Sequence, residues 1–426
     1  MPAFPRNGVR RGMRWDALAP PSLLIFFWIT DLLLPYVYAV TERPWERQAG
    51  ATAMITLGDV HWAMMAAVLY LACWFAGYYA TRWRPAPRLV LRAPLRNLSA
   101  AHLLLNFTAA LAVFLILYAI NPNTDFTSRM ELTLGTWGKA LFLAIGVLFA
   151  AFWLSATGLL QNNGRGVAPW RVMLVLGLSA CMIAVFAPME GRARMLMAVL
   201  YVIVVWHYFV RRLSTAMVWG ALAAGLLVAL GLDYLRLRQE FSQIDPLEMS
   251  YGLAYGRQFD GVMNAAAAMR AVLLGDAEYH YGAAWIADIL RDVGIQTSHP
   301  GSRAAFMTDV LGTPRFAAGF PLTRPGELFF AFGWPGVALG AAVLGALTRL
   351  WYNWVMIGRP FGPASAPVYF TLLMTAGLVT QKNYLFSSLV VACVYAALIL
   401  ALAASLYGYR LAKSRSVIRW KAAQAK

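Results

Sequence analysis

The stretch GFPLTRPGELFFAFGWPGVALG (residues 319–340) decides the fold, because a loop rich in proline and glycine turns there into a long apolar segment. Just before it, residues 234–326 form the longest polar passage of the chain and carry eight arginines. Hydrophobic segments lead up to this passage and away from it. A loop of that length usually has a function of its own, so we expect residues 234–326 to contain the functional part of the chain.

The chain as a whole is strongly apolar: 60% of its 426 residues are hydrophobic, 13% are charged and the mean hydropathy is +0.59. Soluble domains carry about 25% charged residues. Apolar runs of about 18 residues or more recur, and each is long enough to cross a bilayer as a helix. The strands of a membrane barrel would instead alternate apolar and polar residues. The sequence therefore predicts an all-α polytopic membrane protein.

We expect about ten membrane-spanning helices in two groups on either side of the polar passage. The ten segments are 19–40, 60–80, 98–120, 138–160, 171–188, 195–210, 213–233, 327–350, 364–381 and 385–409. They divide the chain into a first half of the transmembrane bundle at 1–233, a large extracytoplasmic loop of short helices at 234–326, a second half of the bundle at 327–410 and a basic cytoplasmic tail at 411–426. The basic run before the first segment is interpreted as part of an uncleaved signal-anchor, since further apolar segments follow.

The distribution of charge predicts the orientation. If the N-terminus is cytoplasmic, the loops on its side hold more than half of the 36 Lys and Arg residues and a single acid, Asp16. Because basic loops stay on the cytoplasmic side, we place both termini in the cytoplasm and residues 234–326 outside it. The net charge of +17 is then an anchoring signal for anionic lipid headgroups, and no nucleic-acid partner is expected.

Within the polar passage, YGAAWIADILRDVGI (281–295) has the pattern of a short amphipathic helix. Its apolar face would carry Trp285, Ile286, Ile289, Leu290 and Val293, and its polar face would carry Asp288, Arg291 and Asp292. A helix of this kind is expected to lie flat on the membrane surface.

Arginines are the candidate groups for binding a phosphate. The guanidinium group is planar, stays charged and binds phosphate oxygens in pairs. Fixed cations beside a lipid diphosphate would stabilise the charge that develops as a glycosidic bond breaks. The candidates are Arg192, Arg194, Arg236, Arg238, Arg303, Arg315 and Arg324. Two of them lie in the short turn MEGRAR (189–194), which is held close to the membrane surface. Each arginine could also be only a salt-bridge partner or a contact to lipid phosphates.

Three side chains are candidates for acid–base chemistry, namely Glu327, Asp260 and His280. Glu327 begins an apolar segment and could accept a proton from an attacking sugar hydroxyl, although a carboxylate is also favoured there by the helix dipole. Asp260 follows Arg257 by three residues, a spacing that also fits a helix salt bridge. His280, like His299, has a side chain that titrates near neutral pH.

No metal ion or cofactor is expected. The motifs HExxH, CxxC and DxD do not occur, and neither does a nucleotide-binding glycine loop. The three cysteines, at positions 73, 181 and 393, are isolated within apolar segments, so the sequence indicates neither a disulfide framework nor a metal site.

The end of the polar passage resembles the late motif of Wzy-type oligosaccharide repeat unit polymerases, in which a proline and a Gly-Glu pair precede a span that begins with Phe-Gly-x-x-Gly. The residues that carry this resemblance are Gly319, Pro321, Thr323, Gly326, Glu327, Phe332, Gly333 and Gly336. The step Gly191-Arg192 resembles the Gly-Ser-Arg or Gly-Arg turn between two mid-chain spans of that family. Here Arg192-Ala-Arg194 replaces the commoner single arginine.

The resemblance implies a metal-independent glycosyltransferase of the GT-C type in the bacterial inner membrane. It implies polymerisation of undecaprenyl-diphosphate-linked oligosaccharides into a surface polysaccharide, with membrane lipids and a chain-length regulator protein as further partners. By motif, the site carries over to Arg192, Arg324 and Glu327. Two alternatives remain open: a polysaccharide ligase or another polyprenyl-phosphate-dependent glycosyltransferase, and a lipid-linked saccharide flippase or transporter. Ligases usually carry a His-Asn motif in the large loop, whereas His299 is followed by Pro300.

Overall fold

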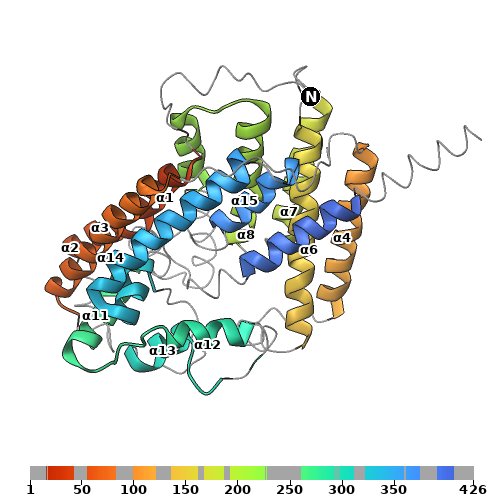
Figure 1. Cartoon of the computed structure of the whole chain (residues 1–426). Coiled ribbons are helices and arrows are strands. Elements are labelled where there is room, and N and C mark those ends of the chain that lie inside the picture. Colours follow the sequence, from red (N-terminus) through yellow and green to blue (C-terminus); the bar gives the residue numbers. More distant parts are fainter. Residues whose placement is uncertain are drawn as a thin grey trace, which may run out of the picture.

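The computed structural model describes residues 16, 18–42, 55–82, 99–120, 136–161, 167–186, 192–225, 227, 261–292, 295, 297–310, 322–358, 361–374 and 391–406. Within these residues all regular structure is helical (Figure 1). Six helices are long and apolar enough to cross a membrane, at Pro20–Thr41, Leu57–Ala80, Ala100–Ile120, Ala140–Leu160, Pro169–Phe186 and Arg324–Ile357. They indicate a multi-pass membrane protein, as the composition predicts.

Each of these six helices coincides with one of the ten predicted spans. The four other predicted spans coincide with shorter apolar helices, at Met197–Val210, Thr215–Gly225, Ser365–Met374 and Val391–Leu406. Six is therefore the number of spans that the described residues support, and ten remains a prediction.

The first span consists of three consecutive pieces, which are α1 (Pro20–Trp28), the π-helical turn η2 (Ile29–Leu33) and α2 (Leu34–Glu42). The next helices are α3 (Leu57–Ala80), α4 (Ala100–Ile120), α6 (Thr136–Leu160), α7 (Pro169–Phe186) and α8 (Arg192–Val205) with the π-turn η6 (Trp206–Val210). After the loop follow α14 (Arg324–Tyr352), the turns η8 (Asn353–Ile357) and η9 (Gly362–Ala364), and α15 (Ser365–Met374).

Helices α3 and α14 cross with their backbones in contact, because glycines face the partner helix. A Cβ atom added to Gly77 would lie 1.9 Å from the carbonyl oxygen of Ala342, and one added to Gly345 would lie 2.0 Å from that of Trp74. In a membrane, where lipid removes the hydrophobic drive for helix association, small residues of this kind allow close van der Waals packing. This contact fixes the position of α14, which carries the candidate site.

Helix α6 packs against α4, α7, α8 and α15 in the other half of the bundle. Its Trp153 lies in an aromatic cluster, with its ring centroid 5.4 Å from that of Tyr201 and 5.5 Å from that of Phe370. The hydroxyl groups of Thr157 and Tyr201 are hydrogen-bonded to each other at 2.5 Å. The hydroxyl groups of Thr157 on α6 and Tyr201 on α8 are thus paired between two helices inside the core.

Three short helices of the polar passage, α11 (Gly261–Leu274), α12 (Ala283–Asp292) and α13 (Ser302–Ala305) with the π-turn η7 (Phe306–Val310), lie at one end of the bundle, which we call the loop end. Short helices were predicted here, and α11 packs against α3 and α14. Its alanine run is buried, and Arg270 forms an ion pair of 2.9 Å with Asp59 at the start of α3.

Helix α12 exists as predicted, but Asp288 of its predicted polar face is buried. Ala284, Ala287 and Asp288 face the protein, and the carboxylate of Asp288 accepts a hydrogen bond from the backbone N–H of Ser302 at 3.1 Å. Ile286, predicted on the apolar face, is exposed. This hydrogen bond explains the difference, because Asp288 binds the first residue of α13 and is therefore held inward.

Candidate functional site

The site is built on a break in α14. Gly333 has φ 66° and ψ −154°, a conformation outside the helical region, and Pro335 follows two residues later. Proline has no N–H group, so the carbonyl of Ala331, four residues before it, loses its helical donor. The segment before α12 fills the gap: the N–H of Tyr281 donates to the oxygen of Ala331 at 3.0 Å, and that of His280 to the oxygen of Phe330 at 3.4 Å.

A tight turn brings this segment back into α12. Tyr281 has φ 44° and Gly282 has φ 81°, two consecutive residues with positive φ. A side chain other than glycine rarely adopts such a conformation, and hydrogen bonds to the broken helix hold Tyr281 in it. The break in α14 therefore sets where His280 and α12 lie.

A buried ion pair occupies the first turn of α14. Arg324 is 0% exposed and Glu327 is 2% exposed, and Arg324 Nη1 lies 2.7 Å from Glu327 Oε2. The other carboxylate oxygen, Oε1, accepts a hydrogen bond of 3.1 Å from the indole Nε1–H of Trp285 on α12. A cation is unfavourable at a helix N-terminus, so the carboxylate three residues along compensates the charge of Arg324. Both oxygens of Glu327 thus have donors.

A small cavity lies against this pair. It has about 210 Å³ of empty space, including the part open to solvent, and His280, Gly282, Trp285, Ser302, Glu327 and Phe330 line it. The Ser302 hydroxyl is buried and has no hydrogen-bond partner among the described residues. His280 Nε2 lies 3.7 Å from Asp309 Oδ2 and forms no shorter hydrogen bond within the described part of the chain. The cavity therefore offers a serine hydroxyl and an imidazole nitrogen to a polar group.

The histidine of this cavity favours its neutral form. Burial lowers the pKa of His280 and outweighs the opposing effect of Asp309, while the neighbouring His299 lowers the pKa further and Glu278 raises it. The imidazole ring stacks edge-on against Phe330, with 4.5 Å between ring centroids. A neutral imidazole near pH 7 can accept a proton from a bound hydroxyl.

The structure brings together three of the predicted site residues, Glu327, Arg324 and His280. Arg194 lies on α8, with its guanidinium carbon 5.7 Å from the centroid of the Phe186 ring. Four predicted residues, Asp260, Arg236, Arg238 and Arg315, lie outside the described residues. The backbones of Arg192 and Arg303 belong to α8 and α13, but their side chains are not among those described.

Sequence reasoning missed three groups at the cavity, Ser302, Asp309 and the indole N–H of Trp285. Trp285 was predicted as part of an apolar face, and no motif marks its contact with a glutamate 42 positions later. The sequence signal for Ser302 is its position at the start of α13, where a serine is common.

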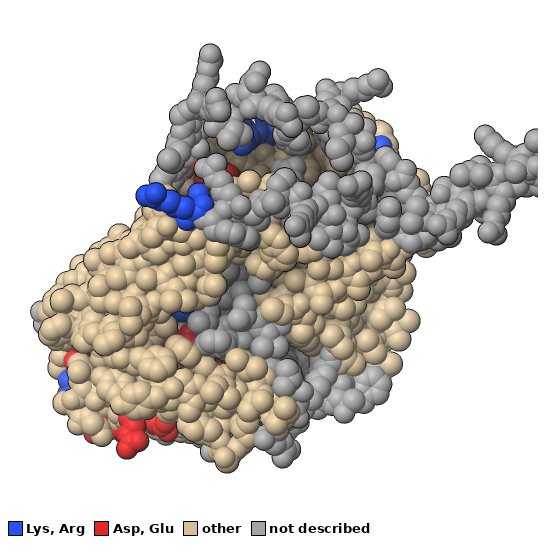
Figure 2. Space-filling model, in the orientation of Figure 1, with Lys and Arg blue, Asp and Glu red and all other residues tan. Residues whose placement is uncertain are grey.

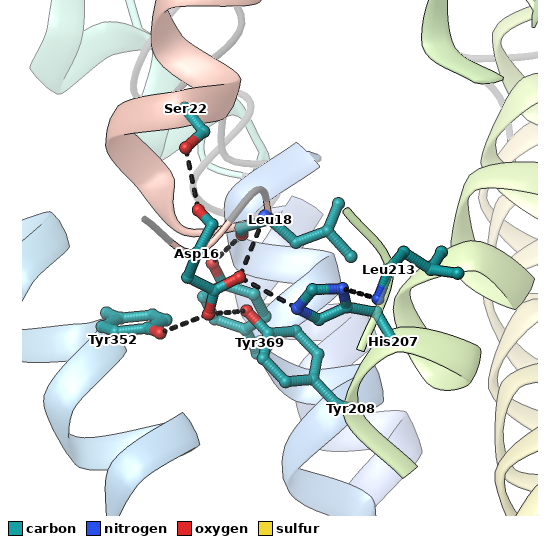
Figure 3. Close-up of polar contacts among 8 residues, drawn as sticks. All are labelled: Asp16, Leu18, Ser22, His207, Tyr208, Leu213, Tyr352 and Tyr369. Atoms are coloured by element: carbon teal, nitrogen blue, oxygen red, sulfur yellow. Dashed lines mark hydrogen bonds and ion pairs between the residues drawn. The ribbon is translucent and has the colours of Figure 1, made fainter. Parts of the chain in front are cut away.

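A second polar cluster, at the opposite end of the bundle, was also missed (Figure 3). We call it the Asp16 cluster, and it comprises Asp16, His207, Tyr208, Tyr352 and Tyr369. Asp16 Oδ1 lies 3.0 Å from His207 Nε2, and Oδ2 accepts hydrogen bonds from the hydroxyls of Tyr208 at 3.2 Å and Tyr352 at 3.0 Å. The Tyr369 hydroxyl donates to the carbonyl oxygen of Leu18 at 3.0 Å. The cluster joins the start of α1 to η6, α14 and α15.

The hydrogen bonds fix the protonation of this cluster. His207 Nδ1 accepts from the backbone N–H of Leu213 at 3.1 Å, so the ring proton sits on Nε2 and is donated to Asp16. Burial raises the pKa of Asp16, but the hydrogen bonds from His207, Leu18 and Tyr352 outweigh it and hold the pKa below its usual value. Asp16 is thus an ionised carboxylate surrounded by donors.

The chain matches no known protein family, no curated protein and no solved structure. Among the described residues, no group of three or more His, Cys, Asp or Glu side chains is placed to hold a metal ion. Its function must therefore be argued from the two polar clusters and the sequence.

Proposed function

We propose that this protein is a membrane glycosyltransferase that polymerises undecaprenyl-diphosphate-linked oligosaccharide repeat units on the outer face of the bacterial inner membrane. The observation that carries the proposal is the cavity at the break in α14, where a buried Glu327–Arg324 pair meets His280 and a serine hydroxyl that has no partner among the described residues. The resemblance of residues 319–340 to Wzy-type polymerases supports it, because the break and the ion pair both lie in that segment.

In this reaction His280 accepts the proton. A hydroxyl oxygen of the acceptor sugar attacks the anomeric carbon of the growing chain, and the bond from that carbon to the diphosphate oxygen breaks. The diphosphate leaves with the electron pair, and the hydroxyl proton passes to the neutral imidazole of His280. Ser302 hydrogen-bonds the attacking hydroxyl group. The rings of Trp285 and Phe330 line the cavity and offer apolar faces to a sugar ring.

Glu327 has a different role from the one its sequence position first suggests. Both of its oxygens are occupied, by Arg324 and by Trp285, so we assign it to holding these two side chains at the cavity wall. Arg324 is neutralised by this contact and would have to leave Glu327 to bind a diphosphate. We therefore assign the diphosphate to the other predicted arginines, Arg192, Arg194, Arg236, Arg238, Arg303 and Arg315.

The test uses the purified full-length protein in lipid nanodiscs, incubated with lipid-linked oligosaccharide and examined by gel for a ladder of chain lengths. We expect His280→Gln to lower the initial rate by about 10²- to 10⁴-fold, the usual effect of removing a general base. His102→Gln, in the first turn of α4 and outside the residues that line the cavity, is the matched control and should retain the wild-type rate. A wild-type ladder from His280→Gln would overturn the assignment of the base.

The product also separates the polymerase from the alternative glycosyltransferases. A ladder supports polymerisation, whereas one added sugar, or transfer of a finished chain to a lipid acceptor, indicates a single-sugar transferase or a ligase. Absence of any covalent product from protein that still binds the substrate would contradict all three enzymatic functions.

A flippase or transporter for lipid-linked saccharides is a second candidate, and the Asp16 cluster favours it. Hydrogen bonds of this cluster hold four elements together at one end of the bundle, while the cavity opens at the other. A transporter needs one end closed while the other is open. Movement of a fluorescent lipid-linked saccharide across vesicles, without a covalent product, would support this candidate and count against the polymerase.

A further inference from the structure

Large apolar side chains are exposed at the loop end, next to the cavity. Tyr281 is 72% exposed and Ile286 is 61% exposed, and both belong to α12 or the turn before it. Leu273 and Leu274, at the end of α11, and Ile295, just beyond α12, are exposed as well. None of these residues lies in one of the six candidate spans, so spanning the membrane does not explain their exposure.

The exposed face of α12 cannot turn inward, because the other faces are fixed by hydrogen bonds. Asp288 binds the backbone N–H of Ser302, and Trp285 binds Glu327. Ala284 and Ala287 are buried between these two anchors. Rotation of the helix to bury Ile286 would break both hydrogen bonds and expose the buried alanines, which costs more than burying one isoleucine gains.

This exposed face is continuous with the lipid-facing surface of α14. Phe332 lies on α14 beside the break and is 39% exposed, and its ring centroid is 6.4 Å from that of Tyr281 and 5.3 Å from that of Trp285. Further along α14, Leu339, Val343 and Leu347 are exposed on a helix long and apolar enough to span the membrane. Phe332 therefore links the exposed side of α12 to a surface that lipid covers.

The charged side chains of the loop end lie beyond the apolar surface, as expected at the boundary between a membrane and water. Figure 2 shows a broad area, on the left of the view, where the described surface carries few charged side chains. Acidic side chains lie at the lower edge of this area, at the loop end. Asp276, Glu278 and Asp309 of the loop end are exposed. Aromatic and apolar side chains followed by charged ones are typical of the interface between hydrocarbon and water.

We propose that the exposed face of α12, with Tyr281 and Phe332, lies in the headgroup region of the bilayer, so that the cavity at the α14 break opens beside lipid instead of bulk water. The occupant of this surface is the membrane itself. Gly282 and Trp285 line the cavity and also contact Phe332, so a substrate anchored in the same leaflet would reach the cavity without leaving the membrane.

The test measures lipid contact directly. In a chain whose cysteines 73, 181 and 393 are replaced by serine, a single cysteine is introduced by Ile286→Cys and labelled with a bimane fluorophore. The labelled protein is placed in nanodiscs with or without nitroxide-labelled lipids, and quenching by these lipids is compared with quenching by iodide in the water. Leu339→Cys is the lipid-facing control, and Asp276→Cys is the water-facing control.

We expect nitroxide lipids to quench position 286 at least half as strongly as position 339, and iodide to quench it at least threefold less than position 276. Tyr281→Cys should give the same pattern and serves as a second reporter. If position 286 behaves like position 276, the surface faces water and the proposal is wrong. If both quenchers fail there, another protein surface covers α12, which also overturns it. The measurement needs no substrate, so its result is independent of the proposed function.

Discussion

Two carboxylates lie at opposite ends of the bundle, Glu327 buried and Asp16 half-buried, and the two ends compensate their charge in different ways. Glu327, at the loop end, faces the guanidinium group of Arg324, which is charged at any working pH. Asp16, at the other end, is surrounded by three side-chain donors that carry no net charge and by one backbone N–H. The charge of Glu327 is compensated by one cation, whereas that of Asp16 is compensated by several hydrogen bonds from neutral groups.

The difference teaches how each end should respond to change. An ion pair depends on both partners, because a buried charge left alone is costly. A network of neutral donors loses only one hydrogen bond at a time, but its carboxylate can still be protonated. The ion pair at the cavity leaves His280 as the group there that can accept a proton, whereas the hydrogen bonds of the Asp16 cluster hold helices together.

The largest effect is expected from breaking the ion pair. Arg324→Met leaves the Glu327 carboxylate buried without its cation, which should destabilise the protein by about 3–5 kcal/mol. The double variant Arg324→Met/Glu327→Gln removes the charge as well and should regain most of this loss. Melting temperatures of the variants in nanodiscs measure both effects. Equal melting temperatures for wild type and Arg324→Met would show that the pair is not buried as described.

A smaller and pH-dependent effect is expected at the other end. Asp16→Asn weakens three hydrogen bonds to a charged acceptor and should cost about 1.5–3 kcal/mol at pH 7. Because the pKa of Asp16 is lowered in the folded protein, its contribution is present above the ordinary pKa of aspartate, about 3.9, and is lost as the pH falls through the lower folded value.

Melting temperatures of wild type and Asp16→Asn between pH 7 and pH 3 therefore test whether the hydrogen bonds to Asp16 hold the helices together. The difference in melting temperature between the two proteins should be constant at neutral pH and should become smaller as the pH falls below about 4. A difference that stays the same down to pH 3, or no difference at pH 7, would mean that the carboxylate does not hold the helices together.

The smallest effects come from removing one donor at each end. Trp285→Phe removes the N–H that binds Glu327, and Tyr352→Phe removes the hydroxyl that binds Asp16. Each should cost about 1 kcal/mol, since each carboxylate keeps its other donors. The two variants should differ in function: Trp285→Phe alters the cavity wall and should slow the ladder assay, whereas Tyr352→Phe should leave its rate unchanged. Equal rates in both would remove Trp285 from the site.

Helix α12 illustrates the limit of reading a helical pattern. The pattern at 281–295 predicted the helix correctly, because apolar residues recur at helical spacing. It placed Asp288 on the outer face, whereas this carboxylate points inward and caps α13. A periodic pattern counts apolar side chains, but a hydrogen bond to a particular backbone N–H depends on where another segment lies. The same limit explains why the contact between Trp285 and Glu327 could not be predicted.

The sequence by itself determined that the chain is helical and crosses a membrane several times, because the length of an apolar run is a local property that lipid converts directly into a helix. It also singled out Glu327 and Arg324 as candidate site residues, because both lie in the motif at the start of an apolar segment. Only the tertiary structure decided that Trp285 and His280 join them, and that Asp16 meets His207 and Tyr352. Those contacts join segments far apart in the chain, and they depend on how a broken helix and close-packed glycines arrange the bundle.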